Sequence, residues 1–243
     1  MRNSWGMRLL ITRPREDAEP LAALLGGRGF ETILDPMMTI TDVAAPDLDL
    51  SGVQALLVTS ANGIRAFARR DDNRQIPVCA VGDASALAAR ELGFEAVTSA
   101  GGDVETLAAL VVDALTPNQG ALLHIAGSRV AGDLSGLLEA AGFKVRRGVL
   151  YEATAADALR PQTLDHLDAG TVDGVLLFSP RTSSLFTRLV MAAGRAERCR
   201  AVVAYCLSQA VADNTQPIAW NNVVVAPKPN QQALLDIIGS TGE

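Results

Sequence analysis

The chain contains an internal repeat, and this feature limits the possible folds more than any other. Leucine, glycine and phenylalanine residues near the start recur 113 positions later, in the same order and spacing. The matched pairs are Leu9 with Leu122, Leu10 with Leu123, Leu21 with Leu134, Leu24 with Leu137, Leu25 with Leu138, Gly29 with Gly142 and Phe30 with Phe143. Further matches pair Val53–Ser60 with Val172–Ser179, Pro77–Val81 with Ala201–Tyr205, and Gly102–Leu107 with Pro229–Leu234, at offsets of 119, 124 and 127. Offsets that increase along the chain indicate one duplicated unit with short insertions in the second copy.

Short, continuously apolar runs alternate with helical patterns within each copy. In the first copy the predicted strands are Leu9–Thr12, Thr32–Leu34, Leu56–Thr59, Val78–Val81 and Ala96–Thr98. Runs of this kind are typical of parallel strands that helices cover on both faces. The stripe Leu21, Leu24 and Leu25 has helical spacing, and Gly29 and Gly142 follow such stripes at the expected positions of helix C-caps. We therefore expect an α/β fold with two flavodoxin-like lobes of about five parallel strands each.

Composition narrows the classes of function. Hydrophobic residues make up 49% of the chain and charged residues 20%, as in a folded soluble protein. A net charge of −6 argues against general attraction to nucleic acid or to an anionic membrane. No window approaches the roughly 20 apolar residues of a membrane span, and the apolar run Met7–Ile11 is too short for a signal peptide. We expect a cytoplasmic protein.

Neither a metal site nor a nucleotide site is indicated. Cys79, Cys199 and Cys206 form no CxxC pair, and the two histidines are far apart in the sequence with no cysteine nearby. The chain has no GxGxxG and no P-loop motif, and the glycines of Gly26–Gly29 fall at a predicted helix end. We expect no metal and no cofactor, with the three thiols reduced and buried.

Small polar residues follow the predicted strands, where the next helices begin. Ligands bind at these positions in parallel sheets, and helix N-termini there present N–H groups that suit carboxylates and phosphates. The candidate binding residues of this kind are Thr59, Ser60, Asn62, Gly82, Ser85, Ser179 and Ser208. Each serine taken singly is also a common helix N-cap. Together they predict a cleft rich in main-chain donors, suited to an extended ligand with many carboxylates.

Arginines and one tyrosine complete the candidate site. Arg13, Arg129 and Arg181 lie just beyond strand ends, where a planar guanidinium can bind a carboxylate through two hydrogen bonds. Arg74, by contrast, is expected on a solvated helix surface. Tyr151 follows the segment that repeats the second strand, and a place in the hydrophobic core is the alternative for this residue.

The ordered set of these motifs resembles the uroporphyrinogen-III synthase family over nearly the whole chain. The motifs are Ile11–Pro14, Leu57–Gly63, Ala80–Gly82 with Ser85–Ala86, Gly102–Leu107, Ala140–Phe143, Val149–Glu152, Leu177–Pro180 and Leu207–Ala212. The resemblance implies two lobes joined by two crossing strands. Lobe 1 would comprise residues 1–36 and 157–243, lobe 2 residues 43–150, and the linkers 37–42 and 151–156. The repeat alone is equally consistent with tandem lobes.

The resemblance also implies an activity. Enzymes of this family convert hydroxymethylbilane, a linear tetrapyrrole with carboxylates on every ring, to uroporphyrinogen III. The reaction removes water, inverts ring D and serves the biosynthesis of heme, siroheme, cobalamin or chlorophyll-type products, without metal or cofactor. Tyr151 matches the family tyrosine that assists departure of the hydroxyl as a general acid. The implied protein is a monomer whose partners are hydroxymethylbilane and, transiently, the preceding pathway enzyme.

The two copies differ at one pair of positions, and an alternative function remains. The second copy has Cys206 and Gln209 where the first has Gly82 and Ser85, so a ligand contact from Gln209 is not expected. The alternative function is that of a non-catalytic, two-lobed binding or sensor protein for a small anionic ligand.

Overall fold

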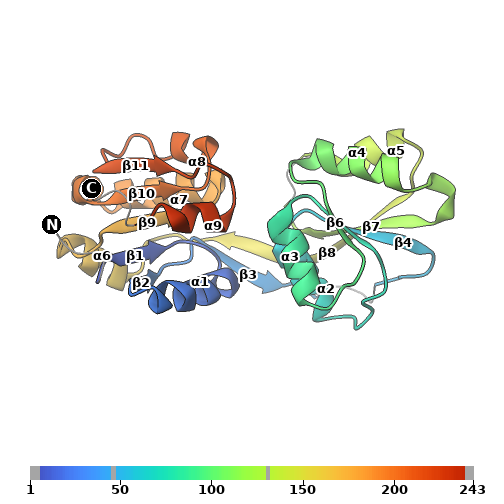
Figure 1. Cartoon of the computed structure of the whole chain (residues 1–243), viewed down its shortest axis with the longest axis horizontal. Helices are drawn as coiled ribbons and strands as arrows, with labels where there is room; N and C mark the ends of the chain where they lie inside the picture. Colours follow the sequence, from blue (N-terminus) through green and yellow to red (C-terminus); the bar gives the residue numbers. More distant parts are fainter. Residues whose placement is uncertain (1–5, 45–47, 130–131, 239–243) are drawn as a thin grey trace. The chain divides into compact units, whose positions relative to one another are not determined.

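The chain folds into two α/β units (Figure 1). The computed structural model describes residues 6–44, 48–129 and 132–238. Unit 1 combines the segment up to Thr39 with the segment from Thr154 onward, and unit 2 is Ile40–Ala153. The α/β class predicted from the repeat is confirmed, because strands and helices alternate through both units.

Within the described residues, unit 1 holds a parallel sheet in the order β11-β10-β9-β1-β2. Its strands are β1 (Arg8–Ile11), β2 (Glu31–Leu34), β9 (Gly174–Leu177), β10 (Val203–Cys206) and β11 (Asn222–Val225). Its helices are α1 (Arg15–Gly27), α6 (Pro161–Asp168), α7 (Pro180–Ala192), α8 (Gln209–Asp213) and α9 (Gln231–Asp236), with a 3₁₀ turn at Ala196–Ala201. Leucines of α1 and α9 pack on one face of this sheet, around the buried Tyr205.

Unit 2 holds a sheet in the order β3-β8-β7-β4-β5-β6. Its strands are β3 (Met38–Asp42), β4 (Val53–Val58), β5 (Val78–Ala80), β6 (Val97–Ser99), β7 (Ala121–Gly127) and β8 (Val145–Ala155). Its helices are α2 (Ala61–Ala68), α3 (Asp83–Glu91), α4 (Val104–Ala114) and α5 (Leu134–Ala140), with a 3₁₀ turn at Pro117–Gln119. Apolar side chains of α2 and α3 cover one face, and those of α4 and α5 cover the other.

Each sheet combines strands from both copies of the repeat. In unit 1, β1 and β2 of the first copy pair with β9, β10 and β11 of the second. In unit 2, β7 and β8 of the second copy pair with β4, β5 and β6 of the first. Both units therefore have the flavodoxin-like order 2-1-3-4-5 when their strands are numbered within the repeat. Strands are thus exchanged between the copies, as the family resemblance implied, and the tandem arrangement is excluded.

The segments that join the units are β3 and β8. The Val43 N–H donates to Leu150 O, and the Ala156 N–H donates to Met37 O, both at 2.9 Å. Residue numbers rise along one strand as they fall along the other, so these two strands are antiparallel, unlike the predicted all-parallel lobes. A chain that leaves one unit and returns to it beside its own path must run in opposite directions.

The repeat extends to details of conformation and exposure. Gly29 has φ 87° and Gly142 has φ 89°, so both adopt the left-handed conformation predicted for glycines after a helix. Leu24 and Leu137 are each 42% exposed, although the helical stripe predicted that they would be buried. The buried face of each helix is therefore narrower than expected. In α1 the buried leucines are Leu21 and Leu25, and in α5 they are Leu134 and Leu138.

Arg74 corrects a second expectation. It lies in the loop before β5 and not on a helix, and its guanidinium donates to the carbonyl oxygens of Ala68, Asp71 and Leu92. The guanidinium carbon also lies 5.0 Å from the centroid of the Phe94 ring. Arg74 therefore organises this loop and is only partly exposed.

Candidate active site

The strands of each parallel sheet end at one side, which we call the carboxyl edge of that unit. Most residues that the sequence predicted for binding lie at these two edges. The structure brings Thr59, Ser60, Asn62, Gly82, Ser85, Arg129 and Tyr151 into unit 2, and Arg13, Ser179 and Ser208 into unit 1.

A β-bulge aims Tyr151 in unit 2. Ala126 of β7 pairs with Val149 of β8, but the next residue, Gly127, pairs with Tyr151, so Leu150 is the extra residue. Consecutive side chains of a regular strand face opposite sides of the sheet. Here Leu150 and Tyr151 both join the same apolar cluster. The bulge thus turns Tyr151 at the point where β7 ends.

Gly127 gives the Tyr151 ring its space. A Cβ on Gly127 would lie 2.9 Å from Cε2 and Cζ of the ring, closer than real side chains tolerate. The Ser128 N–H donates to Tyr151 O at 2.9 Å and ties the following turn to β8. Tyr151 is 8% exposed, and its hydroxyl makes no hydrogen bond to any residue that the structure describes. The phenol is packed on its faces and open to a ligand at its hydroxyl.

A buried histidine of β7 contacts Thr59 of this edge. His124 is in the middle of β7, a strand whose other residues are all apolar or glycine, and it is 3% exposed. Its Nε2 lies 3.3 Å from Oγ1 of Thr59. Burial, reinforced by the positive charge of Arg147 on β8, lowers the pKa of His124 to about 4. His124 is therefore neutral at pH 7.

Ser60 and Asn62 form the start of α2. Ser60 is the N-cap, and its Oγ accepts a hydrogen bond from the Asn62 N–H at 3.2 Å. Oδ1 of Asn62 is buried and has no hydrogen-bond partner within the described segments. The cap interpretation of Ser60 is thus correct, and the hydroxyl retains a proton that it can donate.

The start of α3 differs from that of α2. Gly82 is the N-cap and provides no side-chain cap, so the first N–H groups of α3 depend on other partners. Ser85 is the third residue of the helix and is buried, at 6% exposure, so it is not a cap. Asp83 occupies the first turn and accepts a hydrogen bond from Ser99 Oγ at 2.7 Å. Its carboxylate competes there with any anionic ligand.

The arginines predicted to bind carboxylates differ in how they are engaged. Arg13 donates to Gln231 at 2.8 Å, pairs with Asp17 at 3.4 Å, and lies 4.4 Å from the centroid of the Phe178 ring. Arg129, directly after Ser128, is exposed and has no partner among the described residues. Arg181 is likewise exposed, in the first turn of α7. Arg13 is therefore mainly structural, whereas the other two are available to a ligand.

The two serines of unit 1 also differ. Ser179 is the N-cap of α7: its Oγ accepts from the Thr182 N–H at 3.2 Å and donates to Thr182 Oγ1 at 2.9 Å. Ser208 is the N-cap of α8 but makes no side-chain cap hydrogen bond. Ser208 therefore corresponds to Gly82, since each is the N-cap of its helix. The sequence comparison matched Gly82 with Cys206, which is two positions too early.

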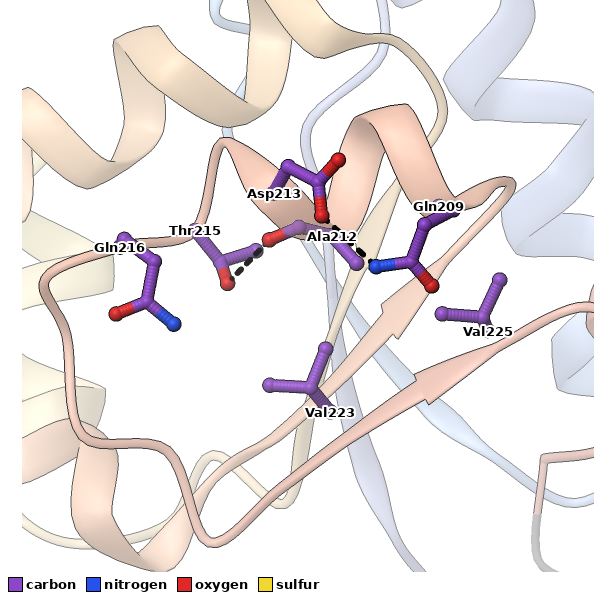
Figure 2. A pocket seen from close by; sticks show the side chains of 7 residues that line it. All are labelled: Gln209, Ala212, Asp213, Thr215, Gln216, Val223 and Val225. Atoms are coloured by element: carbon purple, nitrogen blue, oxygen red, sulfur yellow. Dashed lines mark hydrogen bonds between the residues drawn. The ribbon is translucent and has the colours of Figure 1, made fainter.

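A cavity of about 460 Å³ lies beside α8 and β11 in unit 1 (Figure 2). Its lining comprises Gln209, Ala212, Asp213, Thr215, Gln216, Val223 and Val225. Gln209 Nε2 donates to Asp213 Oδ1 at 2.8 Å, as Figure 2 shows. A carboxylate at the wall repels other carboxylates, so this cavity does not suit a polyanionic ligand.

The cysteines are buried and free of disulfides. Burial raises the pKa of Cys199 and of Cys206 to about 12, so neither is a thiolate nucleophile at neutral pH. Across residues 6–44, 48–129 and 132–238, no three His, Cys, Asp or Glu side chains converge as metal ligands would. No helix in these segments has the length and hydrophobicity to cross a bilayer.

Comparisons with known proteins agree with this architecture. The family model described as uroporphyrinogen-III synthase HemD matches residues 19–236. The chain belongs to the uroporphyrinogen-III synthase family. It is thus a cyclising hydro-lyase of tetrapyrrole biosynthesis, and hydroxymethylbilane is the substrate that the family implies. Nothing in the comparisons favours the alternative of a non-catalytic binding or sensor protein.

Two solved structures of uroporphyrinogen-III synthases have the same fold. A mutant enzyme from Thermus thermophilus is 16% identical, with a TM-score of 0.58, over 98% of this chain and 100% of that one. The enzyme from Helicobacter pylori is 14% identical, with a TM-score of 0.62, over 97% of this chain and 99% of that one. No curated protein sequence matches the chain.

Sequence reasoning missed His124 and Arg147. His124 carries a signal that was available, because a histidine inside a wholly apolar strand has to satisfy a polar ring in the core. Arg147 carries none, since it lies within a predicted strand and its neighbour Arg146 is also an arginine. Only the pairing of β8 with β7 brings Arg147 to the turn that follows β7.

Proposed function

We propose that this member of the uroporphyrinogen-III synthase family cyclises hydroxymethylbilane with Tyr151 as the general acid and with the two carboxyl edges binding substrate carboxylates. The observation that carries the proposal is the setting of Tyr151. Its ring is fixed over Gly127 beside a β-bulge, and its hydroxyl has no partner among the described residues. A phenol held in this way can donate its proton to a bound ligand.

The proton balance of the first step follows from the chemistry of the substrate. The bond between the terminal methylene carbon and its hydroxyl breaks, and the lone pair of the adjacent pyrrole nitrogen replaces it. Tyr151 gives its proton to the departing hydroxyl, which leaves as water. Closure of the macrocycle later releases a proton, and this proton restores the phenol. General acid catalysis of this kind contributes roughly 10²–10⁴-fold to a rate.

Geometric control is the other requirement, because the bilane closes to the symmetric type I isomer without help. Holding the reacting ends in one orientation favours one product over the other. We assign this role in unit 2 to Thr59, Ser60, Asn62, Gly82, Ser85 and Arg129, and in unit 1 to Arg13, Ser179 and Ser208. Arg129 contributes a free guanidinium, whereas Arg13 acts mainly by fixing the loop after β1.

We also propose a cellular compartment, a partner, an oligomeric state and lobe boundaries for this protein. Three free, buried thiols support a reducing compartment such as the cytoplasm. The lability of hydroxymethylbilane favours transient contact with the enzyme that supplies it, and we propose that the chain acts as a monomer. We propose that one lobe comprises residues 1–36 and 157–243 and that the other comprises residues 43–150. The linkers between them are then residues 37–42 and 151–156.

Incubation of the purified protein with hydroxymethylbilane, followed by chromatographic separation of the product isomers, tests the proposed function. We expect type III product in large excess over the type I product of the protein-free control. Type I product alone, at the control rate, would reject the activity. A thermal-shift screen of small carboxylates and phosphates tests the sensor alternative on the same preparation.

A further inference from the structure

Arg147 binds the turn that contacts the proposed acid. It is on β8, opposite His124 of β7, and its Nη2 donates to Gly127 O at 2.9 Å and to Ser128 O at 3.4 Å. These two residues form the turn that supports Tyr151, since Gly127 underlies the ring and the Ser128 N–H donates to Tyr151 O. Arg147, the turn and Tyr151 are thus one connected hydrogen-bond network.

The charge of Arg147 is not neutralised. Its side chain is exposed, and it forms no ion pair with any residue in the described segments. The hydrogen bonds to the turn involve only Nη2, so the remaining N–H donors of the guanidinium are left for other partners. An unpaired guanidinium with free donors is a site for a carboxylate.

Arg146, the preceding residue, provides the contrast. Successive side chains of a strand face opposite sides of the sheet. Arg146 accordingly points elsewhere, where its Nη1 pairs with Asp49 at 3.1 Å and donates to Ser51 O at 3.0 Å. Arg146 therefore has a carboxylate partner within its own unit, whereas Arg147 has none among the described residues.

We propose that Arg147 binds a carboxylate of the linear tetrapyrrole at the carboxyl edge of unit 2, with one guanidinium nitrogen holding the Gly127–Ser128 turn and the others holding the ligand. This inference rests on the proposed function, because it takes the substrate to be a polycarboxylate. It identifies a substrate-binding residue in the strand itself, whereas the other candidates of unit 2 lie in the turns and helix starts that follow strands. A single contact of this kind anchors one carboxylate at the edge of the sheet that also holds Tyr151.

Steady-state kinetics with hydroxymethylbilane on R147Q, R147K and R146Q test the inference. We expect R147Q to raise KM roughly tenfold to a hundredfold, as loss of a hydrogen bond to a charged group does. R147K, which keeps the charge but not the planar fork, should recover part of this loss. R146Q is the matched control and should leave KM within about twofold of the wild-type value. Thermal melting of each variant checks that it is folded.

The split between KM and kcat distinguishes binding from support of the turn. A fall in kcat at unchanged KM in R147Q would show that Arg147 acts only through Gly127 and Ser128, and would overturn the inference. Equal KM values for R147Q and R146Q would also overturn it.

A binding measurement separates this inference from the proposed function. Fluorescence titration with uroporphyrin III, a stable octacarboxylate, should give a Kd roughly tenfold or more weaker for R147Q than for R146Q. If the wild-type protein binds uroporphyrin III through Arg147 but forms no type III isomer, the carboxylate contact is supported and the activity is rejected. If R147Q and wild type bind it equally, the contact is rejected whatever the activity.

Discussion

The chain has two tyrosines, and each lies over a glycine of the neighbouring strand. In unit 1, a Cβ on Gly174 would lie 2.7 Å from the ring of Tyr205; in unit 2, a Cβ on Gly127 would lie 2.9 Å from the ring of Tyr151. Tyr205 is within the internal strand β10 and is 0% exposed, whereas Tyr151 is at the carboxyl edge and is 8% exposed. The same packing arrangement thus fills a core in one unit and orients a candidate acid in the other. Position along the strand, and the bulge in β8, make the difference.

Removal of each hydroxyl is the strongest test of this comparison. Tyr151→Phe keeps the ring over Gly127 but removes the proton donor, so we expect turnover to fall roughly 10²-fold or more. Tyr205→Phe should leave turnover unchanged and lower the free energy of unfolding by about 1–3 kcal/mol, the cost of removing a polar group from a buried site. Rates of type III formation and thermal melting curves measure the two effects. Wild-type turnover in Tyr151→Phe would exclude the general-acid role.

Filling the space under each ring gives the next largest effect. Gly127→Ala should displace the Tyr151 ring and lower kcat roughly tenfold to a hundredfold, because small misplacements of a reacting group are costly. Gly174→Ala places its methyl against Tyr205 and Leu9 in a closed core, and should destabilise unit 1 by about 1–3 kcal/mol. Its kcat per folded molecule should not change. Comparable loss of kcat in both variants would mean that the two tyrosines are not functionally distinct.

His124 adds a buried titratable group to unit 2, next to Thr59, and its effect depends on pH. Its folded pKa of about 4 lies below the ordinary value of 6.5, so the unfolded chain binds the extra proton first as pH falls. Stability from this residue is therefore complete above pH 6.5 and is lost between pH 6.5 and pH 4. From pH 7 to pH 5 the loss amounts to about 2 kcal/mol. His124→Leu should reduce the pH dependence of the unfolding free energy by this amount, as urea titrations at both pH values would measure. An unchanged dependence would mean that His124 titrates normally.

The smallest expected effect is a difference in unfolding free energy between variants of the two N-cap serines of unit 1. Ser179 accepts a hydrogen bond from the Thr182 N–H, so Ser179→Ala should lower the unfolding free energy by about 1 kcal/mol. Ser208 makes no side-chain cap bond, so Ser208→Ala should change it by only a few tenths of a kcal/mol. Urea denaturation of the two variants in parallel gives the comparison. Equal losses would show that Ser208 caps α8 after all.

Much of the fold follows from the sequence. The repeat predicted the class and the strands, and Gly29 and Gly142 ended their helices in the predicted left-handed conformation. Which copies share a sheet did not follow from the repeat, because two similar strand sets can pair within a copy or between copies with the same local pattern. Only the family resemblance predicted the exchange. Leu24 and Leu137 were misjudged because spacing alone does not give the width of the buried stripe.

The candidate site could be predicted only in part. The positions of Ser60, Ser179 and Arg129 at the carboxyl edges could be predicted because these residues follow strands closely, and that rule depends on chain position alone. Arg147 precedes its strand end and reaches the turn only through the pairing of β8 with β7, which is a long-range contact. The bulge that turns Tyr151 depends likewise on the register between these strands. Sequence spacing reveals neither the pairing of β8 with β7 nor the register between them.

The exchange of strands between copies also sets an order of events during synthesis on the ribosome. Unit 2 is one continuous segment, so it can complete its sheet as soon as β8 has emerged. In unit 1, the hydrogen bond from the Arg8 N–H reaches Asp173, which is 165 positions later. At translation rates of about 5–20 residues per second, β1 and β2 wait roughly ten seconds or more for β9. During that interval β1 exposes an apolar strand edge that β9 covers in the folded chain.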